Sequence, residues 1–190
     1  MNIWSVGKNT KRFLSILLVT AVVLMSFPLS VFVGGADIRL WTEAVTEEPV
    51  SGYVSDDDGN VTISTAEGLA WLISVVNGFN GETSNSFVDK TVTLTADIDL
   101  GAYLWTPIGN TNYYPFRGTF EGGNHKISGM NVNLASTGGG DLSGGLFGWL
   151  VNTGSEGGGV IQNVSVSGEV TSNGNDDNYA GGIVGRNEAQ

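Results

Sequence analysis

The stretch Thr91-Val-Thr-Leu-Thr-Ala-Asp-Ile-Asp-Leu100 decides the fold class that this chain predicts. Its odd positions are threonine or aspartate, and its even positions are apolar: Val92, Leu94, Ala96, Ile98 and Leu100. Successive side chains of a strand point to opposite faces, so this alternation predicts a strand with one buried and one solvated face. Shorter alternating runs follow at residues 130–134 and 164–167, separated by turns rich in glycine, asparagine and aspartate.

Two internal similarities indicate a repeated unit. Residues 127–132 (ISGMNV) resemble residues 161–166 (IQNVSV) at an offset of 34, and residues 144–148 (GGLFG) resemble residues 181–185 (GGIVG) at an offset of 37. One such unit cannot bury its apolar face alone, so neighbouring units are expected to stack with parallel strands. The sequence therefore predicts an all-β solenoid over residues 61–190. A β-sandwich is the alternative, because its strands alternate in the same way.

One helix is predicted within this region. Val61-Thr62-Ile63 is typical of a short strand, and Ser64 and Glu67 have the spacing of a capping box. Apolar residues then fall on one helical face up to Asn77-Gly78, which is typical of a helix end. We expect this helix to act as an N-terminal cap that covers the first coil of the solenoid.

Residues 1–36 have the pattern of a signal peptide. A basic start (Lys8, Lys11, Arg12) precedes an apolar run over residues 13–27, and Gly34-Gly35-Ala36 offers small residues for cleavage after Ala36. An uncleaved anchor over residues 13–33 is the alternative. Either interpretation places the bulk of the chain outside the cell or at its surface, with membrane contact only through this segment. Residues 37–60 are expected to form a mobile acidic leader segment, with one short strand around residues 50–54.

Charge and cysteine content exclude several functions. The formal charge is −11, with 19 acidic residues against eight Lys and Arg, so nucleic acid is not expected as a partner. The chain contains no cysteine, which excludes disulfides and cysteine-ligated metals. The mean hydropathy of +0.07 is raised by the apolar N-terminal segment.

The glycine motifs also carry a family resemblance. Residues 145–148 (GLFG) and 182–185 (GIVG) resemble the GLUG motif of bacterial surface proteins. The ordered blocks at residues 96–100, 105–109 and 116–129 resemble the coils that precede such motifs in filamentous-haemagglutinin-like adhesins. The resemblance implies a right-handed parallel β-helix, secreted or attached to the cell surface, and implies no defined chemistry. Members of the family repeat the unit many times, so we expect this chain to be a fragment or a truncated product.

Four aromatic residues are the strongest binding candidates. Tyr103, Trp105, Tyr113 and Tyr114 cluster in the sequence, and Trp149 follows later. Exposed aromatic rings stack on sugars, which would give a glycan-binding surface. The alternative is that Trp105 and Trp149 pack in the core while both tyrosines lie exposed in a loop.

Acidic residues and the single histidine offer weaker candidates. Asp97 and Asp99 share the outer face of one strand and could hold Ca²⁺ or act as an acid and base pair, although solvated strand residues are favoured. His125 lies in a turn without a nucleophile in motif context. Asp56, Asp58 and Asn60 have the spacing of a calcium loop, but Val61 replaces the required glycine, which favours a turn.

The sequence therefore predicts a secreted or cell-surface, adhesin-like binding protein without catalysis and without a cofactor. Glycans or surface proteins of host or bacterial origin are the expected partners. The alternatives are the N-terminal part of a carbohydrate-active β-helix enzyme, a lyase or a glycoside hydrolase, and a calcium-stabilised glycan-binding module.

Overall fold

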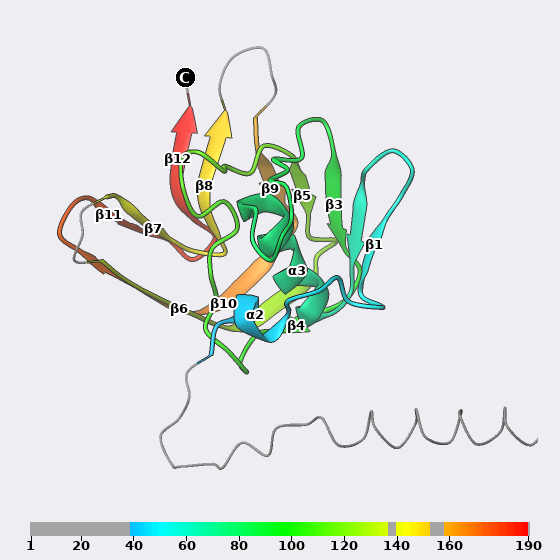
Figure 1. The fold of residues 1–190 in the computed structure, drawn as a ribbon, viewed down its shortest axis with the longest axis horizontal. Helices are drawn as coiled ribbons and strands as arrows, with labels where there is room; N and C mark the ends of the chain where they lie inside the picture. The colour runs from blue at the N-terminus through cyan, green and yellow to red at the C-terminus, as the bar shows by residue number, and fades with distance from the viewer. Residues whose placement is uncertain (1–38, 137–139, 153–157, 190) are drawn as a thin grey trace, which may run out of the picture. The chain divides into compact units, whose positions relative to one another are not determined.

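A computed structural model describes residues 39–136, 140–152 and 158–189 (Figure 1). The chain divides into two compact units, residues 1–37 and 38–190. The expected signal peptide lies outside the described residues and stays a prediction. Within the described part of the chain, no helix has the length and apolarity needed to cross a membrane.

The second unit contains two helices and twelve strands among its described residues. In chain order they are α2 (Trp41–Ala44), β1 (Tyr53–Ser55), β2 (Val61–Ile63), α3 (Ala66–Asn77), β3 (Thr91–Leu94), β4 (Ile98–Asp99), β5 (Thr119–Glu121), β6 (Lys126–Ser136), β7 (Leu142–Gly144), β8 (Phe147–Asn152), β9 (Val160–Gln162), β10 (Ser165–Gly174), β11 (Asn178–Ala180) and β12 (Val184–Ala189).

The strands form four small sheets among the described residues. The largest has the order β1-β2-β3-β5-β9, in which β1 is antiparallel to β2 and the other neighbours are parallel. A second sheet has the parallel order β10-β6-β4. Strand β7 pairs in parallel with β11, and β8 pairs in parallel with β12.

Helix α3 connects the parallel strands β2 and β3 as a crossover. Its first turn is capped by Thr65, whose side chain accepts a hydrogen bond from the Gly68 N–H at 3.1 Å. The predicted cap at Ser64 is therefore wrong by one residue. The helix ends at Gly78, which adopts the left-handed conformation with φ of 71°. Parallel neighbours need a connection of this kind, because a short hairpin cannot return the chain in the same direction.

The predicted fold class, an all-β right-handed parallel β-helix with a capping helix, is wrong. The structure is mixed, with 11% helix and 43% strand in several small sheets that neither close nor curl. Helix α3 is not a cap, because nine of its 12 residues are buried and they include residues on every side of the helix. Alternation and repeat length determine local strand formation, but they do not determine how separate sheets are arranged around a helix.

The strand register supports one internal similarity and corrects the other. Phe147 pairs with Val184, so the GLFG and GIVG motifs lie side by side at the offset of 37. Ile127 pairs with Val166, whereas the offset of 34 had aligned it with Ile161. Ile161 pairs instead with Phe120 of β5. The alignment at the offset of 34 is wrong because it superimposes β6 on β9, two strands of similar composition that pair with different partners.

The core is continuous through the second unit and has an aromatic centre. The ring of Phe147 lies 5.1 Å from both Phe116 and Phe120, and Phe116 lies 6.1 Å from Phe87. All four side chains are buried. Parallel sheets depend on tertiary contacts of this kind, because both faces of such a sheet are buried only when neighbouring elements cover them.

Residues between 39 and 60 also contribute to this core. Trp41 of α2 is buried, and its indole Nε1–H donates to the carbonyl of Leu100 at 3.2 Å. Tyr53 of β1 is buried as well, and β1 lies close to the short strand expected around residues 50–54. Near the C-terminal end of this segment, hydrogen bonds to the Asp56 carboxylate close the turn between β1 and β2.

Candidate functional site

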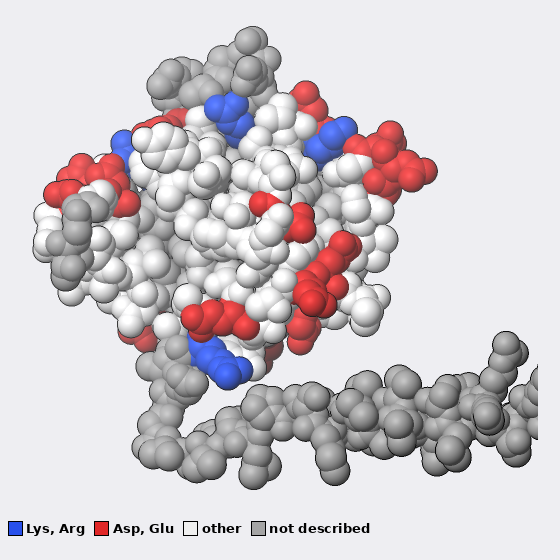
Figure 2. Space-filling view, in the orientation of Figure 1, with Lys and Arg blue, Asp and Glu red and all other residues white. Residues whose placement is uncertain are grey.

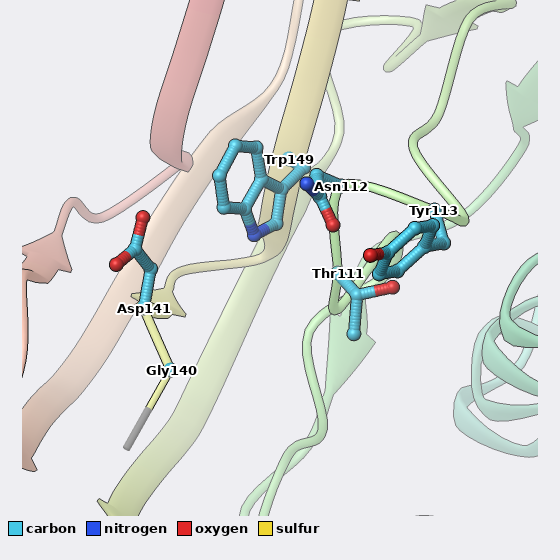
Figure 3. Close-up of a pocket in the computed structure, with 6 residues that line it drawn as sticks. All are labelled: Thr111, Asn112, Tyr113, Gly140, Asp141 and Trp149. Atoms are coloured by element: carbon cyan, nitrogen blue, oxygen red, sulfur yellow. The ribbon is translucent and has the colours of Figure 1, made fainter.

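A surface hollow lies between the loop that precedes β5, the start of β7 and strand β8. We call it the hollow; it has a volume of about 320 Å³. Its lining residues are Thr111, Asn112, Tyr113, Gly140, Asp141 and Trp149 (Figure 3). In the close-up, Tyr113 and Asp141 lie on opposite sides and the indole of Trp149 stands between them. The loop that carries residues 111–113 is distant in sequence from the other two segments, so tertiary contacts bring it to them.

Helix α3 fixes the loop that supplies one side of the hollow. The buried side chain of Asn77 donates from Nδ2 to the carbonyl of Pro107 at 3.1 Å. Its Oδ1 accepts the N–H of Gly109 at 2.8 Å and that of Asn110 at 3.3 Å. A single buried amide therefore satisfies three backbone groups of an irregular segment, which would otherwise lack partners.

The same loop packs directly on the strand that carries Trp149. The Trp149 N–H donates to the carbonyl of Gly109 at 2.7 Å, and the Phe116 N–H donates to the carbonyl of Trp149 at 3.1 Å. Gly109 has φ of 69°, and a Cβ there would lie 2.9 Å from both Phe116 N and Trp149 O. Glycine is thus required at this position for both conformation and space.

An arginine holds the opposite wall of the hollow. The Arg186 guanidinium lies 4.3 Å from the ring centroid of Trp149 and 4.5 Å from that of Tyr179. Its Nη1 contacts Asp141 Oδ2 at 2.7 Å, and its Nη2 contacts Glu188 Oε1 at 2.7 Å. Stacking on two rings and pairing with two carboxylates together fix both the indole of Trp149 and one oxygen of Asp141.

Three buried polar atoms lack partners among the described residues, two of them on residues that line the hollow and one on the preceding Asn110. They are Asn110 Oδ1, Thr111 Oγ1 and Trp149 Nε1. Trp149 is only 4% exposed, and in Figure 3 its Nε1 edge faces the space between Asp141 and Thr111. Leaving a buried donor unpaired costs about 1–3 kcal/mol. A ligand oxygen or a water molecule at this place would relieve that penalty.

Acidic side chains surround this part of the molecule. The Gly140 N–H donates to Asp176 Oδ2 at 2.6 Å, and the Tyr179 hydroxyl donates to Asp177 Oδ2 at 3.2 Å. Figure 2 shows acidic side chains gathered at the edge where β7 and β11 lie in Figure 1. The electrostatic potential near the hollow is therefore negative, which disfavours anionic ligands.

The structure separates the four aromatic residues that the sequence grouped. Tyr113 lines the hollow and is 82% exposed, whereas Tyr114 is 42% exposed and is not part of the lining. Trp105 is buried in the core, and its Nε1–H donates to the carbonyl of Leu146 at 3.1 Å. Tyr103 packs edge-on against Trp41 with ring centroids 5.0 Å apart. Core packing, the alternative noted for Trp105, is therefore correct.

Sequence reasoning missed the polar members of the hollow. Thr111, Asn112 and Asp141 belong to no recognisable motif, and they lie in turn-like segments where such residues are common. Trp149 was noted, but the sequence carries no signal that its indole N–H would be left without a partner. The nearest signal is the glycine motif just before it, since that motif pairs in register with residues 182–185.

The two strand aspartates do not form a joint site. Asp97 Oδ1 accepts the backbone N–H of Lys126 at 2.9 Å and lies 3.2 Å from His125 Nδ1. The Lys126 N–H and then the His125 side chain hold the pKa of the Asp97 carboxyl below its usual value. Asp99 Oδ1 instead accepts the Gly101 N–H at 3.0 Å. Among the described residues, no group of three or more His, Asp or Glu could hold a metal ion.

The acidic segment at the β1–β2 connection is a turn, as the sequence favoured. Asp56 Oδ1 accepts the N–H groups of Asp58 at 3.0 Å and Asn60 at 2.8 Å. These bonds, with that from the Asn60 side chain as the largest cause, lower the pKa of the Asp56 carboxyl. The carboxylate therefore closes the turn.

Comparison of the chain with family models, with curated proteins and with solved structures finds no match. The resemblance to GLUG-motif surface proteins accordingly stays a prediction from the sequence. The hollow is thus the feature from which a function can be argued.

Proposed function

We propose that this chain is an exported, cell-surface protein of adhesin-like function that binds glycans in the hollow and performs no chemistry on them. The observation that carries the proposal is the pairing of an exposed Tyr113 ring with a buried, unpartnered Trp149 Nε1–H in one concave surface. Export is supported by the signal-peptide pattern of residues 1–36.

The chemistry of the hollow suits a sugar. A pyranose ring presents C–H groups on its faces and hydroxyls around its edge, so it binds an aromatic ring and several polar groups at once. Tyr113 offers the ring, while Thr111, Asn112 and Asp141 offer hydroxyl, amide and carboxylate groups. A volume of about 320 Å³ is at the small end of ligand pockets and suits a short saccharide segment.

Substitution of two adjacent tyrosines tests this proposal. The full chain would first be screened on a glycan array, and the best ligand would then be titrated by calorimetry against the wild type, Tyr113→Ala and Tyr114→Ala. Loss of an aromatic contact of about 0.5–1.5 kcal/mol predicts roughly 2- to 12-fold weaker binding for Tyr113→Ala. Tyr114→Ala is the matched control and should bind as the wild type does.

Two results would contradict the proposal. One is that the wild type binds no array glycan at millimolar concentration. The other is that Tyr113→Ala and Tyr114→Ala weaken binding equally, which would place the ligand outside the hollow.

A further inference from the structure

We infer that the hollow prefers a sugar bearing a protonated amine, such as a glucosamine unit, over neutral sugars, and that it rejects carboxylated sugars. This inference rests on the proposed glycan-binding function and specifies the ligand class of the same site. It depends on three features: the unused oxygen of Asp141, the engagement of Arg186, and the composition of the lining.

Asp141 has one carboxylate oxygen available. Its Oδ2 is bound by Arg186 Nη1 at 2.7 Å, while Oδ1 has no partner among the described residues. The side chain is 38% exposed and lines the hollow, so Oδ1 is within reach of a ligand in this space. A carboxylate oxygen accepts a hydrogen bond from an ammonium group more strongly than from a neutral hydroxyl.

Arg186 is not available to bind an anionic ligand. Its two terminal nitrogens each contact a carboxylate, from Asp141 and Glu188, and its faces lie over Trp149 and Tyr179. An incoming uronate or sialate carboxylate would have to displace one of these partners. It would also approach Asp176 and Asp177, which bond to the neighbouring Gly140 and Tyr179. Two carboxylates contact the guanidinium, and those of Asp176 and Asp177 lie beside Gly140 and Tyr179, so the four carboxylates and one guanidinium leave this region net negative.

The aromatic and polar lining fits a cationic sugar as well. The face of Tyr113 is available for stacking against the C–H groups of the sugar ring. Trp149 Nε1–H is a donor only, so it matches a sugar hydroxyl or ring oxygen rather than the amine. The amine is therefore directed to the Asp141 side of the hollow, opposite Tyr113 in Figure 3.

The test compares four oligosaccharides of equal length with the full chain. They are oligomers of glucosamine, N-acetylglucosamine, glucose and galacturonic acid, titrated by calorimetry at mildly acidic pH, where amine and carboxylate are both charged. A charge-assisted hydrogen bond of about 1.5–3 kcal/mol predicts roughly 12- to 160-fold tighter binding of the glucosamine oligomer than of its acetylated form. Galacturonate oligomers should bind more weakly than glucose oligomers.

Two variants and a salt series make the result specific. Asp141→Asn should remove the advantage of the glucosamine oligomer over the glucose oligomer, so that the ratio of the two affinities approaches one. Asp177→Asn removes a nearby charge outside the lining and should retain most of the advantage. In the wild type the advantage should shrink as salt is added, because screening weakens the charged contact.

The outcomes separate this inference from the proposed function. Equal affinity for glucosamine and acetylated oligomers, or an advantage that survives in Asp141→Asn, would overturn the inference while Tyr113-dependent glucose binding still supports the function. Absence of binding to all four oligosaccharides, together with a blank glycan array, would overturn both.

Discussion

Replacing Asn77 by alanine gives the sharpest test of how the fold supports the hollow. The substitution removes the side chain that bonds to the carbonyl of Pro107 and to the N–H groups of Gly109 and Asn110. Each buried backbone group left without a partner costs about 1–3 kcal/mol, so three such groups bound the loss between about 3 and 9 kcal/mol. Water entry and the long 3.3 Å bond reduce the loss, and we expect about 3–5 kcal/mol.

The assay is chemical and thermal unfolding of the variant beside a matched control. Ser74→Ala alters another buried polar residue of α3, whose hydroxyl accepts one bond from Asn80 Nδ2 at 3.0 Å. That control should lose only about 1 kcal/mol, because Asn80 also bonds to the carbonyls of Thr42 and Val45. For a domain of this size, 3–5 kcal/mol lowers the melting temperature by roughly 6–20 °C.

Local measurements add a second criterion. Amide exchange of Gly109 and Asn110 should accelerate more in Asn77→Ala than in Ser74→Ala, because the bonds to these N–H groups are lost directly. An Asn77→Ala variant that loses less than about 1 kcal/mol and keeps slow exchange at both amides would refute this account of the loop.

Three further changes have defined outcomes. Phe147→Ala should lose about 3–5 kcal/mol in urea unfolding, because its buried ring lies 5.1 Å from two other phenylalanine rings; a loss below 1 kcal/mol would contradict the aromatic core. The lowered pKa of Asp97, caused by the Lys126 N–H and His125, stabilises the fold above the ordinary value of 3.8, and this stabilisation is lost as pH falls through the lowered folded value. Urea midpoints should thus fall less on acidification in Asp97→Asn than in the wild type, and equal falls would argue against the contact. Burial raises the pKa of Tyr53 to about 12, so the neutral Tyr53 side chain contributes to folding stability fully below pH 10, and this contribution is lost as pH rises toward 12. Tyr53→Phe should lessen this loss of stability at alkaline pH. An absorbance titration in which every tyrosine ionises near pH 10 would contradict the raised pKa of Tyr53.

Local patterns in the sequence predict the strands well. Val92, Leu94, Ile98 and Leu100 are buried, as the alternation of residues 91–100 requires. The predicted single strand is nevertheless divided into β3 and β4. The break follows from bonds to other strands, since the Thr95 N–H donates to the carbonyl of Ile63 and Asp97 turns toward residue 126. Alternation alone carries no information about such partners.

The role of α3 could not be read from its own sequence. The apolar face that includes Leu69 and Val76 predicts a helix that packs on something, and the helix is present. Whether it covers an end or crosses between parallel strands depends on where β3 returns, which is a non-local property. Burial of Asn77 on a second face shows that the helix is enclosed, because a buried amide needs partners from several segments.

The hollow illustrates the same limit for a site. Tyr113 could be predicted, because an aromatic residue in a polar, turn-rich loop is commonly exposed. Asp141 and Trp149 could not be joined to it, since they lie 28 and 36 residues further along and meet it only through tertiary packing. The other predicted aromatics, Trp105 and Tyr103, pack internally for reasons that involve partners equally distant in the sequence.

The most direct test of the central claim is the NMR signal of the Trp149 indole N–H during titration with the best glycan, assigned with Trp149→Phe. Trp41 and Trp105 provide internal references, because their indole N–H groups already donate to the carbonyls of Leu100 and Leu146. We predict that the Trp149 signal shifts in a saturable manner while the two reference signals stay in place. Saturable binding that leaves the Trp149 signal unmoved would show that the glycan binds elsewhere and would contradict the assignment of the hollow.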